Sequence, residues 1–153
     1  MVPATPGGYP RPVPDVLIAS DEEWVRAEVR SVLSARSELT VIEVTTGAAV
    51  LPAVKRSTPA LAIVDLQIGN MGGMAVCLDL RLEESGGRVD HVPVLMLLDR
   101  RADVFLARRA GAEGWVIKPL DPIRLRKAIT ALLAGGTYHD QSYLPATISQ
   151  SAG

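Results

Sequence analysis

The stretch ALAIVDLQIGNMGG (residues 60–73) decides the fold. Its first six residues are an apolar run that ends in Asp65, and the run carries apolar side chains on both faces. A strand that is apolar on both faces is typical of the centre of a parallel sheet whose two faces are both covered by helices. The polar, glycine-containing remainder predicts a loop that leads from this strand into a helix.

Four further strands are predicted around this central one, and helical patterns separate them along the chain. The clearest helix follows Asp121, a favoured N-cap residue, and Pro122, which suits a first helical turn. Alternating strands and helices predict an α/β protein, a doubly wound parallel sheet of five strands flanked by five helices. The four other strands are DVLIAS (15–20), TVIEV (40–44), VPVLMLL (92–98) and GWVIK (114–118).

Composition favours a single domain and excludes several classes of protein. A chain of 153 residues that is 48% hydrophobic can bury one core. We expect a proline-rich leader over residues 1–14, the domain over 15–134 and a tail over 135–153. A net charge of -1 provides no overall attraction for nucleic acid, and no apolar run suits a signal peptide or a membrane span. We therefore expect a soluble cytoplasmic protein in which Cys77 is buried and reduced.

Polar residues stand where the first, third and fifth predicted strands end. Ser20 and Asp21 follow the first strand, Asp65 ends the third, and Lys118 ends the fifth. In open α/β sheets the working site lies at the carboxyl ends of the strands, so these side chains should meet there. Carboxylates from neighbouring strands can share Mg²⁺, and a lysine opposite them can meet a phosphoryl group. The sequence therefore predicts a metal and phosphate site.

Several segments, covering residues 15–134, resemble the receiver domain of two-component response regulators. The resemblance implies a flavodoxin-like fold and a signalling module rather than an enzyme. It also implies that Asp65 accepts a phosphoryl group from a histidine kinase, with Mg²⁺ held by Asp21, Asp65 and the backbone carbonyl of Gln67. Lys118 would then pair with the phosphoryl oxygens, and Trp115 would occupy the position of a switch aromatic. The segments are VLIASDEEWVRAEVRSVL, PALAIVDLQIGNMGG, VPVLMLL and RAGAEGWVIKPLDPIRLRKAI.

Two positions depart from the receiver pattern. Receivers carry two acidic residues after the first strand, and the first of these is Ser20 here. Loss of an outer-shell partner of this kind weakens metal affinity by about 10- to 100-fold. At the end of the fourth strand receivers have Thr or Ser, and this chain has Leu98, which cannot donate a hydrogen bond to a phosphoryl oxygen. We expect a weakened Mg²⁺ site and a broken link between phosphate and Trp115.

Asp99, next to Leu98, has two interpretations. Its carboxylate could reach Lys118 and mimic an occupied phosphate pocket. Aspartate is also a favoured N-cap, and a helix is predicted to begin near Arg100. We prefer the N-cap interpretation.

The region from 99 to 134 predicts a surface for partners. Its basic residues outnumber its acidic ones, so a protein with an acidic patch could dock there. In receivers the fourth helix, fifth strand and fifth helix form the usual surface for partners and for homodimers. The tail resembles the start of a linker to a DNA-binding domain, and we expect no output domain and no direct nucleic-acid contact. The basic residues are Arg100, Arg101, Arg108, Arg109, Lys118, Arg124, Arg126 and Lys127.

Three function classes follow. The first is an atypical single-domain receiver that signals through protein contacts, with phosphorylation of Asp65 weak or absent. The second is a working phosphoacceptor that relays phosphate from a histidine kinase. The third, a flavin or nucleotide binder, is disfavoured because Asp21, Glu22 and Glu23 would repel a ligand phosphate.

Overall fold

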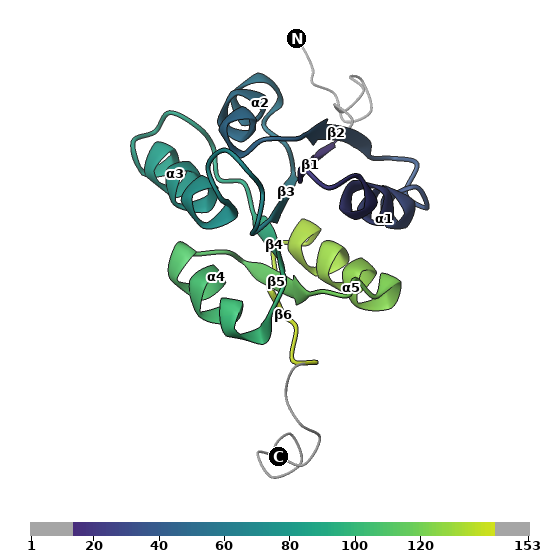
Figure 1. Cartoon of the computed structure of the whole chain (residues 1–153). Helices are drawn as coiled ribbons and strands as arrows, with labels where there is room; N and C mark the ends of the chain where they lie inside the picture. The colour runs from purple at the N-terminus through teal and green to yellow at the C-terminus, as the bar shows by residue number, and fades with distance from the viewer. Residues whose placement is uncertain (1–13, 143–153) are drawn as a thin grey trace.

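A parallel six-stranded sheet lies between two layers of helices in the computed structural model, which describes residues 14–142 (Figure 1). The strand order is β2-β1-β3-β4-β5-β6. Its first five strands follow the flavodoxin-like order, which confirms the predicted fold class. The strands are β1 (Asp15–Ala19), β2 (Thr40–Val44), β3 (Leu61–Asp65), β4 (Val94–Leu98), β5 (Gly114–Ile117) and β6 (Tyr138–His139).

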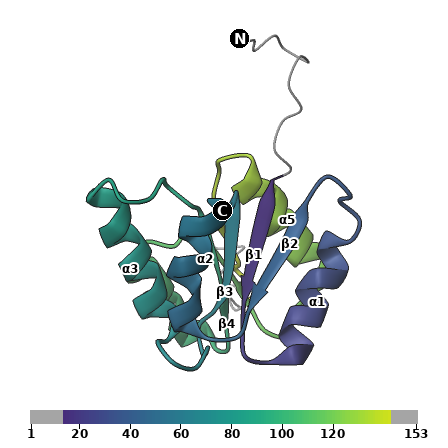
Figure 2. The same ribbon diagram turned by 90° about the horizontal axis from the view of Figure 1, so that it is seen from above.

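Five α-helices cover the two faces of this sheet. Helices α1 and α5 lie on one face, and α2, α3 and α4 lie on the other (Figures 1 and 2). A short 3-10 helix, η1, directly precedes α2. The helices are α1 (Glu23–Leu33), η1 (Gly47–Ala49), α2 (Val50–Ser57), α3 (Gly73–Ser85), η2 (Arg101–Asp103), α4 (Val104–Ala110) and α5 (Pro122–Leu133).

The central strand β3 shows why the sheet must be covered on both sides. Leu61 and Ile63 pack in the cluster beneath α1 and α5, whereas Ala62 and Val64 pack in the cluster beneath α2, α3 and α4. All four side chains are buried completely. Because β3 is a central strand that is buried on both faces, its last residue, Asp65, lies in the middle of the carboxyl edge of the sheet and is itself buried.

Helix α5 begins as the sequence predicts. The carboxylate of Asp121 accepts hydrogen bonds from the backbone N–H of Ile123 at 2.7 Å and of Arg124 at 3.3 Å. These two hydrogen bonds hold the pKa of Asp121 below its usual value. Pro122 occupies the first turn, where its missing N–H costs no helical hydrogen bond.

Strand β6 was not predicted. Tyr138 and His139 pair in parallel with Gly114 and Trp115, so the sheet extends beyond β5 into the predicted tail. The next residue, Asp140, is buried. Residues 1–13 of the predicted leader and 143–153 of the predicted tail lie outside the described residues.

Two other features bear on the expectations from the sequence. Cys77 is a buried free thiol, and burial raises its pKa to about 11, in agreement with the structural role predicted for it. Within residues 14–142, none of the helices has both the length and the apolar character needed to cross a bilayer.

Candidate functional site

Four strand ends bring polar side chains together at the carboxyl edge of the sheet. Ser20 follows β1, Asp65 ends β3, Asp99 follows β4 and Lys118 follows β5. Asp65 lies at the centre, because its Oδ2 accepts from Ser20 Oγ at 2.8 Å and its Oδ1 lies 2.9 Å from Lys118 Nζ. The structure therefore brings both Ser20 and Lys118 into direct contact with Asp65.

Ser20 is a fully buried polar residue with both roles of its hydroxyl in use. Its Oγ donates to Asp65 and accepts from the backbone N–H of Glu22 at 3.1 Å. A hydrogen bond to an ionised acceptor is stronger than one between neutral groups. The serine that replaces the expected carboxylate is thus an integral part of the site.

Lys118 is held between two carboxylates. Its Nζ lies 2.9 Å from Asp65 Oδ1 and 2.7 Å from Asp99 Oδ1. Burial by itself would lower the pKa of Lys118, but hydrogen bonds to Asp99 and Asp65 outweigh it and raise the pKa. The backbone N–H of Lys118 also donates to the carbonyl of Leu98 at 2.7 Å, which joins the ends of β4 and β5.

The N-cap interpretation of Asp99 is wrong. The cap position of η2 is occupied by Arg100, whose backbone N–H donates to Asp103 Oδ2 at 3.1 Å. Asp103 therefore supplies the carboxylate that the start of this helix needs. Asp99 precedes the cap by one residue, and its side chain pairs with Lys118 instead.

Asp21 and Gln67 lie on the solvent side of this centre. Asp21 is exposed, and its Oδ2 accepts from the backbone N–H of Gly69 at 3.1 Å. The backbone N–H of Gln67 donates to Asp65 Oδ1 at 3.3 Å. In the described part of the chain, no group of three or more His, Cys, Asp or Glu side chains is arranged to hold a metal ion. Two carboxylates and one carbonyl nevertheless fit Mg²⁺, which commonly binds through one or two carboxylates and keeps several waters.

Leu98 and Trp115 are both buried in the cluster beneath α2, α3 and α4. Leu98 presents no hydroxyl at the end of β4. The Trp115 ring stacks on His139 with a centroid separation of 4.2 Å, and the Arg108 guanidinium lies 5.3 Å from its centroid. The contacts of this ring are therefore with β6 and α4, on the side of the sheet away from α1 and α5.

Trp24 also lies at the site, where the sequence did not predict it. Lys118 Nζ is 5.6 Å from the centroid of its ring, within range of a cation–π interaction. The side chain is half exposed, and its Nε1 donates to Glu22 Oε2 at 3.1 Å. Its position three residues after Asp21, in the first turn of α1, was the available signal.

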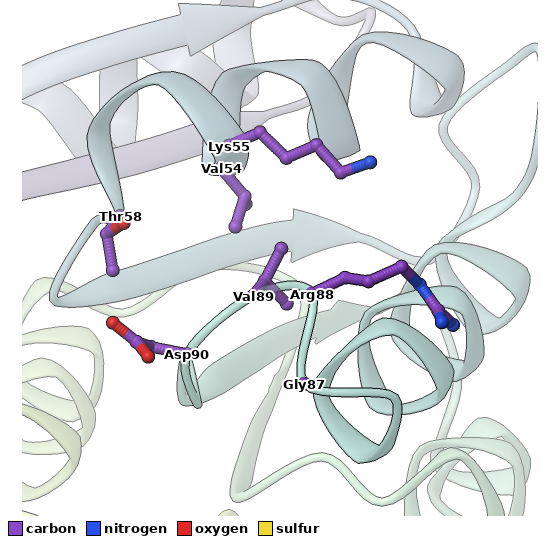
Figure 3. A pocket seen from close by; sticks show the side chains of 7 residues that line it. All are labelled: Val54, Lys55, Thr58, Gly87, Arg88, Val89 and Asp90. Carbon is purple, nitrogen blue, oxygen red and sulfur yellow. The ribbon is translucent and has the colours of Figure 1, made fainter.

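A hollow at the opposite edge of the sheet offers no comparable chemistry. It lies between the end of α2 and the loop that precedes β4, and Val54 and Val89 approach each other within it (Figure 3). Its two cations are already paired, because Lys55 lies 3.5 Å and Arg88 lies 3.1 Å from carboxylate oxygens of Glu83. We therefore place the functional site at the carboxyl edge.

Comparison with known proteins gives the same family throughout. The family model of the response regulator receiver domain matches residues 16–130. An uncharacterized response regulatory protein of Mycobacterium tuberculosis is 33% identical over 123 residues, which cover 77% of this chain and 90% of that protein. The nitrate/nitrite response regulator NarL of Escherichia coli is 26% identical over 131 residues, which cover 85% of this chain and 59% of that protein.

The solved structures agree with the sequence relatives. The signal receiver domain of the putative response regulator NarL from Mycobacterium tuberculosis superposes with a TM-score of 0.70 at 27% identity, covering 81% of this chain and 99% of that one. The family model covers the chain from β1 into α5 and ends at residue 130, before the last residues of α5 and before β6. The chain belongs to the response regulator receiver domain family of two-component signalling.

Proposed function

We propose that this chain is an atypical receiver that signals through protein contacts, with phosphoryl transfer to Asp65 weak or absent. The observation that carries the proposal is the hydrogen bond of 2.8 Å from Ser20 Oγ to Asp65 Oδ2. A carboxylate oxygen that accepts this bond loses electron density that it needs to attack phosphorus. In receivers the residue at this position helps to hold the metal. In this chain the position is Ser20, which stabilises the unmodified carboxylate of Asp65 instead.

The metal requirement supports the same conclusion. Asp21, Asp65 and the carbonyl of Gln67 would hold Mg²⁺, and the ion would neutralise charge on the phosphoryl oxygens. With serine in place of the other carboxylate, we expect the affinity for Mg²⁺ to be about 10- to 100-fold below that of a complete site. Asp21 already accepts a hydrogen bond from Gly69 and would have to share its carboxylate.

The end of β4 is equally unsuited to a phosphoryl group. Leu98 is wholly buried and offers no donor. A phosphoryl oxygen that is desolvated without a hydrogen bond costs about 1–3 kcal/mol. Binding of metal and recognition of the phosphoryl group are thus both impaired.

The partner would dock on the side of the molecule formed by α4 and α5, where β6 rather than β5 is the outermost strand of the sheet. Arg126 and Lys127 are exposed on α5, and Arg101 and Arg109 are exposed on the α4 side of the sheet. We propose a protein partner with an acidic surface, either a histidine kinase or a downstream effector. Reversing the charge at Arg126 and Lys127 should weaken capture of that partner and make it less sensitive to salt. Capture that is unchanged by both substitutions would remove this face from the proposal.

Phosphorylation is tested directly with acetyl phosphate. After incubation with acetyl phosphate and Mg²⁺, intact mass should show most of the natural protein unmodified. The matched control is Asp65→Asn, which defines the background from other sites. Extensive modification that disappears in Asp65→Asn would contradict the proposal.

That contrary result would favour the second function, a working phosphoacceptor that relays phosphate. The ion pair of 2.9 Å between Lys118 and Asp65 supports it, since the lysine is already beside the acceptor. Two further measurements distinguish these functions. A relay transfers labelled phosphate from Asp65 to a histidine on another protein. An atypical receiver that carries Asp65→Asn binds its partner as well as the natural protein does.

A further inference from the structure

The carboxylate that follows β4 takes part in the site although the receiver pattern gives it no role. Asp99 Oδ1 lies 2.7 Å from Lys118 Nζ, closer than Asp65 Oδ1 at 2.9 Å. The Asp99 side chain is 40% exposed, so it reaches the ammonium from the solvent side, whereas Asp65 lies beneath it. One cation is therefore shared by two anions of different exposure.

The Trp24 ring lies against the same ammonium. Its centroid is 5.6 Å from Lys118 Nζ, and the Lys118 side chain is only 13% exposed. Carboxylates and an aromatic ring thus surround the charged group. Two carboxylates already take up donors of the ammonium, so an incoming anion competes with Asp65 and Asp99 for Lys118.

We propose that Asp99 is a built-in anion that occupies Lys118 in place of a phosphoryl oxygen and competes with any phosphoryl group that enters at Asp65. This deepens the proposed function and rests on it for the role of Asp65 as the entry point. A phosphoryl group on Asp65 would bring its own anionic oxygens toward Lys118. With Asp99 in place these oxygens meet a like charge beside the ammonium, and like charges that close repel each other even at a partly exposed position.

The same contact has a consequence for the loop between β4 and η2. Asp99 is the first residue of that loop, and its ion pair with Lys118 adds to the backbone hydrogen bond from Lys118 to Leu98. The start of the loop is thereby held against the end of β5 by groups of the chain itself. A partner that binds this loop would find its first residue in a fixed position even when Asp65 is not phosphorylated.

Beryllofluoride with Mg²⁺ is a suitable probe, because it is an anionic phosphoryl mimic. Trp24 provides the signal, and a Trp24→Phe variant identifies which part of the fluorescence change comes from it. The natural protein is compared with Asp99→Asn, which keeps the shape and removes the charge, and with Asp99→Glu, which keeps the charge. Asp90→Asn, at the opposite edge of the sheet, is the control for net charge.

The concentration of beryllofluoride at half response should be about tenfold lower for Asp99→Asn than for the natural protein, which corresponds to about 1.4 kcal/mol. Asp99→Glu and Asp90→Asn should stay near the natural value. An Asp99→Asn protein that is folded by circular dichroism and binds the probe equally, more weakly or not at all would overturn the proposal.

Acetyl phosphate separates this inference from the proposed function. The extent to which the natural protein is modified at Asp65 tests the proposed function alone. The ratio of the modification rates of Asp99→Asn and the natural protein tests the competition, whatever the absolute rates are. If the natural protein is already extensively modified and Asp99→Asn is modified faster still, the inference is supported and the proposed function is contradicted.

Discussion

Ser20→Asp restores the missing carboxylate of the receiver pattern, and its effect on stability can be worked out from the contacts. The Ser20 side chain is completely buried against Asp65, so the substitution places two carboxylates side by side. Two unit charges about 4 Å apart repel by about 4 kcal/mol at an effective dielectric constant of about 20. Lys118 already neutralises part of this charge. We therefore expect the free energy of unfolding at pH 7 without Mg²⁺ to fall by about 2–4 kcal/mol, including the lost hydrogen bond.

Mg²⁺ should reverse this loss. An ion that binds only the folded state adds about 2.7 kcal/mol at 100 times its dissociation constant. Ser20→Asp should therefore regain most of its lost stability in millimolar Mg²⁺, whereas the natural protein gains little. The two proteins are expected to differ strongly without the ion and to converge with it.

Urea unfolding followed by circular dichroism, with and without Mg²⁺, measures these quantities. Ser20→Asn is the matched control, because it changes the hydroxyl without adding charge and should show no Mg²⁺-dependent recovery. The reasoning would be refuted if Ser20→Asp were as stable as the natural protein in the absence of Mg²⁺. It would also be refuted if the natural protein gained as much from the ion as Ser20→Asp.

Three further expectations concern the fold. Because burial raises the pKa of Cys77 to about 11, a thiol reagent at pH 8 should label it slowly in the native protein and fast in urea, and rapid native labelling would contradict this. Asp140→Ala leaves the buried N–H of Ile117, which donates to Asp140 at 2.8 Å, without its acceptor; denaturant titration should show a loss of about 1–3 kcal/mol, and a smaller one for Asp140→Asn. Gly47→Ala would place a Cβ 1.7 Å from the carbonyl oxygen of Met71, so its melting temperature should fall, by an amount equivalent to about 1–3 kcal/mol.

Four of the five main strands could be predicted because they are the apolar runs that packing against helices requires, and β2 because Val41, Ile42 and Val44 favour a strand. Strand β6 could not, since Tyr138 and His139 form a pair too short to show any periodicity. Contacts with the region of β5 hold the segment in place, among them the hydrogen bond from Ile117 to Asp140, and a contact between residues 23 positions apart leaves no local pattern. The end of the sheet is therefore a product of tertiary structure.

The candidate site likewise contains residues that the sequence predicts and residues that it does not. Asp65 and Lys118 are predictable, because both stand at strand ends on one edge of a parallel sheet. For Asp99, the local preference for an N-cap and the distant attraction of Lys118 compete, and only the structure shows that Asp103 already meets the helix's need. Trp24 was missed because an exposed aromatic in a first helical turn gives no indication of which side chain lies over it.

The short strand β6 also covers a border of the sheet that would otherwise be open to strand pairing. All four residues of β5 are buried, and without β6 this apolar strand would form the border of the sheet. An unpaired strand border is a template for strands of other molecules, and natural proteins blunt such borders with very short strands. With β6 in place the exposed border is only two residues long and carries a tyrosine and a histidine. The segment after α5 thus limits a route to aggregation that an apolar β5 would otherwise open.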